Sequence, residues 1–313
     1  MTVNWPEEKQ LFRWIDGEIS NWNKWGKGDQ KGTLNYLTDD HTLRAIKLIE
    51  SGEKVSCSKT ITFENSTSLK VAPNHFMISA GDTYRENENH ERQVAMDYFG
   101  LVFHGHSITH VDSLAHFFWN GKTYNGRPSS VVSTEKGATE FDVIPAKGGI
   151  ITRGILVDVP KLRGVKYIEK GDGVGLEDIK QFENESGIKI GNGDVILLRT
   201  GQLGNTSTEG PINIENGSAG PSPDILPFLY DREVSIMGSD TGNDIAPNPY
   251  EKFTNPIHQI GIVSMGLWIL DNAWLDDLSE TCEKNKRWEF AINILPLPMK
   301  TVTGSPVNPM AIF

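Results

Sequence analysis

Apolar residues recur with helical spacing in four segments of the chain. In the first, residues 38–50, Leu43, Ile46 and Ile49 repeat every three positions behind a capping threonine and aspartate, and a Ser-Gly pair follows. This pattern predicts a helix. The same spacing predicts further helices over 176–183, 225–233 and 276–284.

Short apolar runs rich in β-branched residues, separated by turn residues, predict strands. They lie at 60–63, 101–103, 149–152, 154–159, 194–200, 234–240 and 290–295. Helices and strands alternate without an internal repeat or a linker-like stretch, so the pattern predicts an α/β fold with a mixed sheet. We expect residues 1–50 to form a looped N-terminal extension with one helix, packed on a main domain of residues 51–313.

Composition and charge narrow the choice of partners. The 313 residues include 30 Lys and Arg against 41 Asp and Glu, a formal net charge of −11. Nucleic-acid binding depends on clustered basic residues, so this balance argues against a nucleic-acid partner and favours a small molecule. No stretch has the roughly 18 apolar residues of a membrane span, and the start lacks the basic and apolar regions of a signal peptide. We expect a cytoplasmic protein that does not bind membranes.

Four of the eight histidines fall within thirteen residues, at His104, His106, His110 and His116, and Asp112 lies among them. Imidazole nitrogens and a carboxylate oxygen are ligands of zinc, manganese and iron. On a regular strand, positions six residues apart lie about 20 Å from each other. On a helix, Asp112 would point away from His106 and His110. The spacing therefore predicts a tight turn leaving a strand.

Each histidine alone could be a hydrogen-bonded core residue. Burying several imidazoles and a carboxylate in one short segment is costly for every group that lacks a partner, and one metal ion satisfies them together. Other catalytic patterns are missing, because the sequence contains no HExxH, GxSxG, P-loop or GxGxxG motif. The two cysteines, Cys57 and Cys282, form neither a disulfide framework nor a metal knuckle.

The histidine segment reads His106-Ser-Ile-Thr-His110-Val-Asp112-Ser-Leu-Ala-His116. It resembles the signature H-x-G-T-H-x-D-x-P-x-H of the putative cyclase family of metal-dependent hydrolases, which contains bacterial kynurenine formamidase, isatin hydrolase and trans-dienelactone hydrolase. Ile108 replaces the signature glycine and Leu114 replaces the proline, which concerns the shape of the turn and substrate access. Further stretches resemble the longer branch of the family, at 25–38, 153–159, 193–201, 238–241 and 304–309.

The resemblance implies a single-domain, cyclase-like α/β fold whose mixed sheet has a barrel-like core flanked by helices. It also implies that His106, His110 and Asp112 coordinate one divalent metal ion per subunit, either zinc or manganese. His116 would then be the acid/base beside the bound water.

A further histidine and an acid from the C-terminal third complete the site in relatives, and His258 and Asp271 stand at about those places. Asp271 has an alternative role as a helix-capping or solvated acid. The open positions of a three-ligand site can hold a water whose pKa falls toward about 7. We therefore expect a metal-dependent hydrolase that opens a cyclic amide or lactone, or cleaves an arylformamide. Two alternatives stay open: a lyase or cyclase that acts through an enolate without consuming water, and a non-catalytic metal- or ligand-binding protein.

Aromatic residues near these motifs predict a pocket for a planar or cyclic substrate. The candidate substrate-binding residues are Trp25, Tyr98, Phe118, Trp119, Tyr124 and Trp268. The alternative for each is packing in the core. Relatives are commonly dimers or larger, and the Trp- and Pro-rich ends of the chain could complete the pocket of a neighbour, so we expect a homo-oligomer and, most simply, a homodimer.

Overall fold

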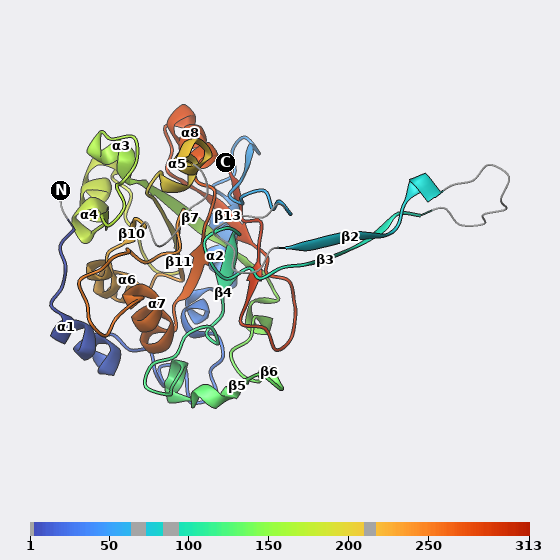
Figure 1. Cartoon of the computed structure of the whole chain (residues 1–313). Coiled ribbons are helices and arrows are strands. Elements are labelled where there is room, and N and C mark those ends of the chain that lie inside the picture. Colours follow the sequence, from blue (N-terminus) through green and yellow to red (C-terminus); the bar gives the residue numbers. More distant parts are fainter. Residues whose placement is uncertain (1–2, 64–72, 84–93, 210–216) are drawn as a thin grey trace.

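The computed structural model describes residues 3–63, 73–83, 94–209 and 217–313. Within these ranges nine strands form one mixed sheet (Figure 1), in the order β1-β15-β13-β7-β9-β11-β12-β4-β14. Four parallel strands make its centre: β7 (Ile150–Asp158), β9 (Val195–Arg199), β11 (Ile236–Ser239) and β12 (Trp268–Asp271). The antiparallel strands at its two sides are β1 (Lys54–Ser56), β15 (Met310–Ile312), β13 (Glu289–Ile294), β4 (His110–Asp112) and β14 (Gly304–Pro306). The sheet curls into a half-barrel, so the mixed, barrel-like α/β core predicted from the sequence is confirmed.

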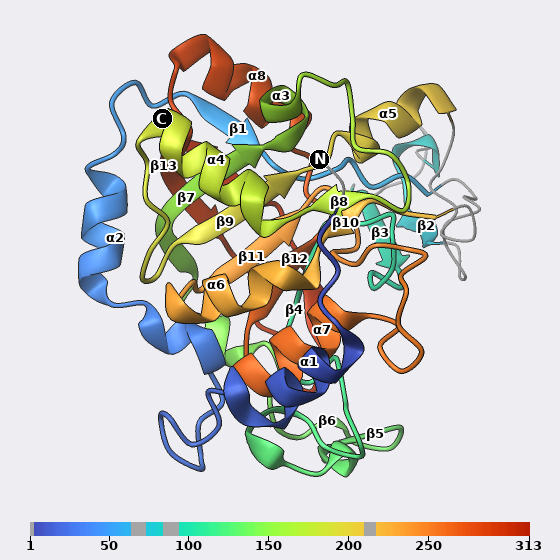
Figure 2. The same ribbon diagram turned by 90° about the vertical axis from the view of Figure 1, so that its left-hand side faces the viewer.

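Helices cover this sheet. In Figure 2, α4 (Leu176–Ser186) and α6 (Leu226–Asp231) lie in front of the central strands, and α2 (Asp39–Ile46) lies beside β13 and β7. Helix α8 (Asp276–Asn285) packs on β1 and β7. The remaining α-helices of the described ranges are α1 (Glu8–Arg13), α3 (Val159–Arg163), α5 (Gln202–Glu209) and α7 (Pro256–Ile260). Parallel strands covered on both faces are apolar without a break, which explains the continuous run in β9, where Val195–Leu198 are fully buried.

Most predicted elements are confirmed with shifted ends, but two predicted strands are absent and two others form a single strand. The runs at 149–152 and 154–159 belong to one strand, β7. Arg153, the charged residue between them, lies within this strand, and its guanidinium forms ion pairs with Asp194 and Glu289. The runs at 60–63 and 101–103 are irregular.

A two-stranded hairpin lies between those two irregular runs. It consists of β2 (Asn74–Ser79) and β3 (Met96–Gly100), which Figure 1 shows projecting away from the body of the molecule. The sequence pattern missed it because both of its faces are exposed, so no alternation of apolar and polar residues marks it. Two smaller two-stranded sheets pair β5 (Val132–Ser133) with β6 (Gly137–Ala138), and β8 (Gly173–Val174) with β10 (Gly220–Pro221).

The N-terminal segment packs against a π-helical turn, Gly261–Met265, that leads into β12. Trp22 Nε1 donates to Val263 O at 2.6 Å, and Asn21 Nδ2 donates to Met265 O at 2.8 Å. This segment contains α1 and a second π-helical turn besides α2, more helix than the sequence predicts. A domain boundary at residue 50 stays a prediction. None of the helices in the described ranges has the length and apolar character needed to cross a membrane.

Candidate metal centre

Strand register brings the histidine motif together with an acid from the C-terminal third. Strand β4 runs antiparallel to β12, and His110 pairs directly with Asp271 at the carboxyl end of β12. Successive side chains on a strand alternate between its faces, so His110 and Asp112 point to the same side of β4. Residues 104–107 form a turn ahead of this strand. The predicted turn therefore enters a strand rather than leaving one, and that part of the prediction is wrong.

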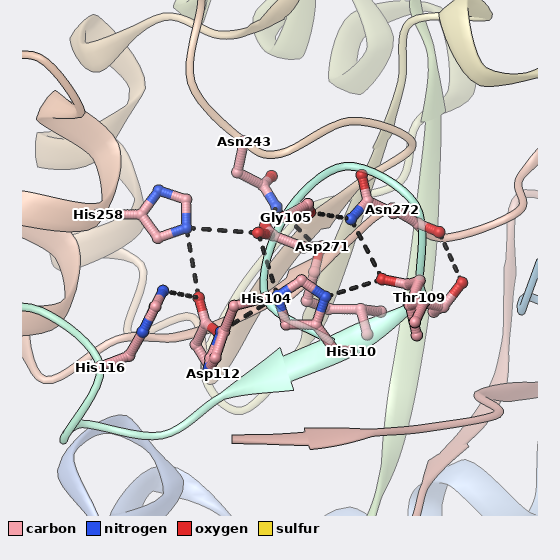
Figure 3. A network of polar contacts seen from close by, with 12 residues as sticks. His104, Gly105, Thr109, His110, Asp112, His116, Asn243, His258, Asp271 and Asn272 are labelled. Atoms are coloured by element: carbon pink, nitrogen blue, oxygen red, sulfur yellow. Dashed lines mark hydrogen bonds and ion pairs between the residues drawn. The ribbon is translucent and has the colours of Figure 1, made fainter. Parts of the chain in front are cut away.

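Asp112 lies at the centre of the site and is fully buried (Figure 3). Its Oδ1 lies 3.0 Å from His104 Nδ1 and 3.5 Å from His110 Nε2. Its Oδ2 lies 3.3 Å from His258 Nε2 and 3.8 Å from His116 Nε2. The chain thus directs four imidazoles at one carboxylate.

A hydrogen bond to the loop before β4 fixes the orientation of the His110 ring. Its Nδ1 lies 2.8 Å from the carbonyl oxygen of Ile108 and donates to it, which leaves Nε2 facing Asp112 and Asp271. Asn272 Nδ2 donates to Gly105 O at 2.7 Å and so ties the turn to the end of β12. The buried Ile108, which replaces the signature glycine, thus takes part in the support of the site.

His258 enters the site from α7 and is held by a second buried carboxylate. Its Nδ1 lies 2.6 Å from Asp244 Oδ2, and the other oxygen of Asp244 accepts from the backbone N–H of Ile257 in the first turn of α7. The remaining nitrogen, Nε2, lies 3.5 Å from Asp271 Oδ2. Asn243 Nδ2 donates to the other oxygen of Asp271, at 2.5 Å. Asp271 is therefore a member of this buried cluster, not a solvated acid.

His116 and His104 form the partly exposed side of the cluster. Their rings stack with centroids 3.7 Å apart and planes 7° from parallel, and about a fifth of each side chain is exposed. His104 Nε2 lies 2.9 Å from Thr303 Oγ1. His116 ends a turn closed by the bond from its N–H to Ser113 O, and the fully buried Leu114 of this turn, which replaces the signature proline, packs in the core.

His106 lies in the turn before β4 and is mostly buried. Its ring packs against the backbone of Gly242, where a Cβ atom would lie 2.7 Å from Nδ1. This nitrogen has no hydrogen-bond partner. The motif implies that His106 is a metal ligand, but in the structure His104 lies closer to Asp112 than His106 does. The role of His106 therefore stays a prediction.

Buried polar atoms without a hydrogen-bond partner indicate whether these residues fit a metal ion. Ten buried side-chain atoms in the described ranges lack a hydrogen-bond partner, and five belong to this site: His104 Nδ1, His106 Nδ1, His110 Nε2 and both oxygens of Asp112. Two groups offer ligand atoms within 4.8 Å of one another, His104 with His110 and Asp112, and Asp112 with His258 and Asp271. Buried polar atoms are rarely left unpaired, and imidazole with carboxylate suits zinc, manganese or iron. The donor set therefore fits a divalent cation.

The ionisable groups of the cluster differ in how their surroundings shift their pKa values. Burial acts to raise the pKa of Asp112, but the histidines around it, His116 foremost, hold that pKa well below its usual value. Burial acts to lower the pKa of His258, but the carboxylates of Asp271, Asp112 and Asp244 raise it well above the usual value. For His116 burial prevails, and its pKa falls to about 4. The site thus contains charged carboxylates beside a histidine that is neutral at pH 7.

The structure distributes the predicted substrate-binding aromatics over several regions. Phe118 and Trp119 follow His116, and the ring of Trp119 stacks on Phe253 with centroids 4.6 Å apart. Phe118 is exposed, and Tyr98 lies on the projecting hairpin. For these residues a role in binding substrate stays a prediction.

Three of the predicted aromatics contact the N-terminal segment instead. Trp25 contacts Tyr36 edge to face. The buried Tyr124 donates to Asp29, and the indole N–H of the buried Trp268 donates to Lys31 O. These contacts give the three residues a packing role, and their contact with substrate has no support from the geometry.

Sequence reasoning missed three supporting residues, Asn243, Asp244 and Asn272. All three follow the carboxyl ends of the parallel strands β11 and β12, where open α/β sheets place their ligand sites. Asn243 and Asn272 have left-handed backbone conformations, with φ of 51° and 54°. A signal that could have found Asn272 is an Asn directly after a central strand, a pattern that is also common in ordinary turns. Asn243 and Asp244 lie beyond the end of β11 and carry no such signal.

Comparison with known proteins supplies the family. A family model described as putative cyclase matches residues 44–243. A solved structure described as a novel cyclase matches with a TM-score of 0.84 and 24% identity over 95% of this chain and 100% of that chain. No curated protein sequence matches at a comparable level.

Two isatin hydrolase structures are also similar. The enzyme from Labrenzia aggregata bound to benzyl benzoate has a TM-score of 0.56 and 18% identity over 83% of this chain and 93% of that chain. An isatin hydrolase bound to the product analogue thioisatinate has a TM-score of 0.59 and 19% identity over 88% of this chain and 98% of that chain. At these identities the structural likeness shows a shared fold. Because the family model matches well over half of the residues, this chain belongs to the putative cyclase family.

Proposed function

We propose that this protein is a metal-dependent hydrolase that opens a cyclic amide or lactone, or cleaves an arylformamide. The observation that carries the proposal is the buried carboxylate of Asp112, because its two oxygens lack hydrogen-bond partners, as do His104 Nδ1 and His110 Nε2, which face it. The family and the fold shared with isatin hydrolases support the same class of reaction. Zinc and manganese both suit the donors, so either metal is consistent with the proposal.

The residues of the cluster divide into those that hold the ion and those that face solvent. Asp112, His110, His258 and Asp271 are buried and would hold it, together with one histidine of the turn before β4. A divalent ion bound there supplies a water of lowered pKa and polarises the carbonyl group of a substrate. The site opens to solvent on the side of His104 and His116.

His116 is the residue placed to move a proton. Its Nε2 lies 3.8 Å from Asp112 Oδ2, at the edge of the cluster, and the ring is neutral at pH 7. A neutral imidazole can accept the proton of the attacking water and deliver it to the leaving nitrogen or oxygen. A general acid/base of this kind contributes roughly 10²–10⁴-fold to the rate.

A substrate panel with product masses tests the proposed reaction. Protein reconstituted with zinc or manganese is incubated with isatin, other cyclic amides, lactones and an N-formyl arylamine. Hydrolysis adds the mass of water to the product. Turnover without this gain would support the alternative in which a lyase or cyclase acts through an enolate. A metal-replete protein that turns over none of these compounds would contradict the proposal.

Two variants separate metal binding from proton transfer. His110→Ala removes a buried donor, so we expect both metal content and turnover to be lost. His116→Ala should keep the metal while its rate falls roughly 10²–10⁴-fold. His75→Ala, on the projecting hairpin, is the matched control and should keep both. A fully active, metal-replete His116→Ala protein would show that another residue moves the proton.

A further inference from the structure

The C-terminal edge strand β14 lies against the open side of the site, where His104 and His116 are found. Strand β14 pairs antiparallel with β4, and Gly304 lies directly opposite Asp112. A Cβ atom at Gly304 would lie 2.7 Å from Val111 O and 3.0 Å from His104 Cε1. A glycine in a strand often marks such a close approach. Here it leaves the space in which the ring of His104 lies.

Thr303, the residue before this strand, contacts the supports of both histidines. Its Oγ1 lies 2.9 Å from His104 Nε2. Its carbonyl oxygen accepts from the backbone N–H of Ser113 at 3.0 Å, and Ser113 O in turn accepts from the N–H of His116 at 3.1 Å. One residue thus holds the ring of His104 through its side chain and the turn that carries His116 through its backbone.

The ring of His104 covers one face of the ring of His116. The two centroids lie 3.7 Å apart and the planes are 7° from parallel. Phe117 and His258 meet the His116 ring edge to face instead, with interplanar angles of 84° and 79°. Because a parallel contact at this distance leaves no room for the His116 ring to turn toward its neighbour, His104 fixes the plane of that ring.

Asp112 lies at the edges of the same two rings (Figure 3). Its Oδ1 lies 3.0 Å from His104 Nδ1, and its Oδ2 lies 3.8 Å from His116 Nε2. The stacked imidazoles therefore span one carboxylate. Since the rings are in contact, a shift of the His104 ring also shifts His116 Nε2 relative to Asp112.

The two histidines differ in which of their nitrogens are free. Both nitrogens of His104 face protein oxygens, Thr303 Oγ1 and Asp112 Oδ1. In the part of the chain that the structure describes, the side chain of His116 makes no hydrogen bond, and its Nε2 stays 3.8 Å from Asp112. His116 thus keeps nitrogens available for a proton, whereas His104 is held on both sides, as expected of a residue that supports its neighbour.

We propose that His104 is a positioning residue, seated by Thr303 and Gly304, which holds the ring of His116 in the plane in which it moves a proton. The effect on turnover rests on the proposed function, whereas the stacked arrangement does not. A small misplacement of a reacting group can lower a rate by about 100-fold, so kcat should fall roughly 10–100-fold in His104→Ala. KM and metal content should change little, because substrate and ion are held by other residues.

Thr303 supplies a pair of variants that leaves every imidazole in place. Thr303→Val removes the hydroxyl and keeps the shape of the side chain, so kcat should fall roughly ten-fold. Thr303→Ser keeps the hydroxyl and should restore the wild-type rate. Thr42→Val on α2 is the matched control, because it removes a half-buried hydroxyl that donates to Ile151 O, and it should keep the wild-type rate. A Thr303→Val protein as fast as this control would overturn the proposal.

A double-mutant cycle tests whether His104 acts through His116. In a His116→Ala background, His104→Ala should have no further effect on kcat, since the ring that it positions is gone. Two losses that multiply would show that His104 acts independently. Loss of metal in His104→Ala would make it a ligand, and either of these two outcomes contradicts a positioning role.

An NMR measurement keeps the test independent of turnover. In the zinc-loaded wild-type protein, the Cε1–H resonance of His116, identified by its absence in His116→Ala, should be shifted upfield by the stacked ring. The upfield shift should persist in Thr303→Ser and be lost in His104→Ala. An identical resonance in wild type and His104→Ala would refute the stacked arrangement. Because this readout needs no substrate, failure of the proposed function is recognised separately.

Discussion

Asp112 shows how one residue organises the site. It is fully buried, yet the chain provides no backbone or hydroxyl donor for either of its oxygens in the described ranges. A buried carboxylate without such donors is expensive unless cations compensate it. His110 and His258, each with its Nδ1 occupied by a supporting oxygen, direct their Nε2 atoms toward it. This is the arrangement expected where two ring nitrogens and a carboxylate share an ion.

The turn before β4 offers two histidines, and two variants decide which one binds. We expect His106→Ala to lose metal, because His106 Nδ1 is buried without a partner and the motif places the ligand there. His104→Ala should keep its metal, because His104 Nε2 is engaged with Thr303 and its ring stacks on His116. Metal content by elemental analysis is the readout. The reverse outcome, a depleted His104→Ala beside a replete His106→Ala, would move the ligand to His104.

Asp244 is predicted to act through His258 and not on the substrate. In Asp244→Asn the short contact to His258 Nδ1 weakens, so the affinity for metal should fall roughly 10–100-fold while the fold is retained. Competition with a chelator measures this affinity. Asp142→Asn is the control, because Asp142 accepts backbone N–H groups of Ile144 and Thr301 outside the cluster. Equal affinities in the two variants would show that Asp244 has no positioning role.

The spacing of residues in the sequence predicted much of the site, but it missed the supporting residues Asn243, Asp244 and Asn272. The motif around His110, Asp112 and His116 is recognisable because several ligand-type residues lie in one short segment. His258 and Asp271 were placed by resemblance alone, and the structure brings both to Asp112. Asn243 and Asp244 could not be found in this way, because their contacts depend on how the loop after β11 folds over β12.

At the scale of elements, the N-terminal segment fixes the entry to β12. Thr33 N and Thr33 Oγ1 both donate to Gly266 O, and Thr33 Oγ1 also donates to Ser235 O before β11. Gly32 makes this approach possible. Its backbone has φ of 55°, and a Cβ atom there would lie 2.2 Å from Gly266 O. Only a residue without a side chain fits between the two segments.

Gly32→Ala should therefore lower the free energy of unfolding by about 1–3 kcal/mol, through backbone strain and overpacking. Gly28→Ala is the matched control from the same loop, because a Cβ atom at Gly28 would have no neighbour within 4 Å and the φ of this residue is not left-handed. Urea unfolding followed by tryptophan fluorescence gives both values. Equal stabilities for the two variants would mean that the N-terminal segment moves aside at little cost.

Long elements were predicted better than short ones. Helices such as α4 show their period over three turns, and β9 is a continuous apolar run, so the sequence alone identifies them. Strand β4 has three residues and β12 has four, and both carry polar groups of the site, so their patterns are too short to read. The hairpin of β2 and β3 was missed because both of its faces are exposed, so no alternation of apolar and polar residues marks its strands.

For the whole molecule, the metal should contribute to stability as well as to reactivity. The cluster links β4, β12 and α7, so removing the ion leaves buried carboxylates and imidazoles facing one another. We expect a chelator to lower the melting temperature and metal to restore it, because an ion that binds the folded state alone stabilises it. A melting temperature unchanged by complete metal removal would show that the cluster is stable by itself.

The most direct test of the metal centre is the metal stoichiometry of the purified protein. Elemental analysis of wild-type protein reconstituted with zinc or manganese should find one divalent ion per 34.8 kDa chain, and His110→Ala measured beside it should fall well below that value. A wild-type protein that holds no zinc, manganese, iron or cobalt after reconstitution would contradict the metal centre, and the hydrolase proposed from it would fall with it.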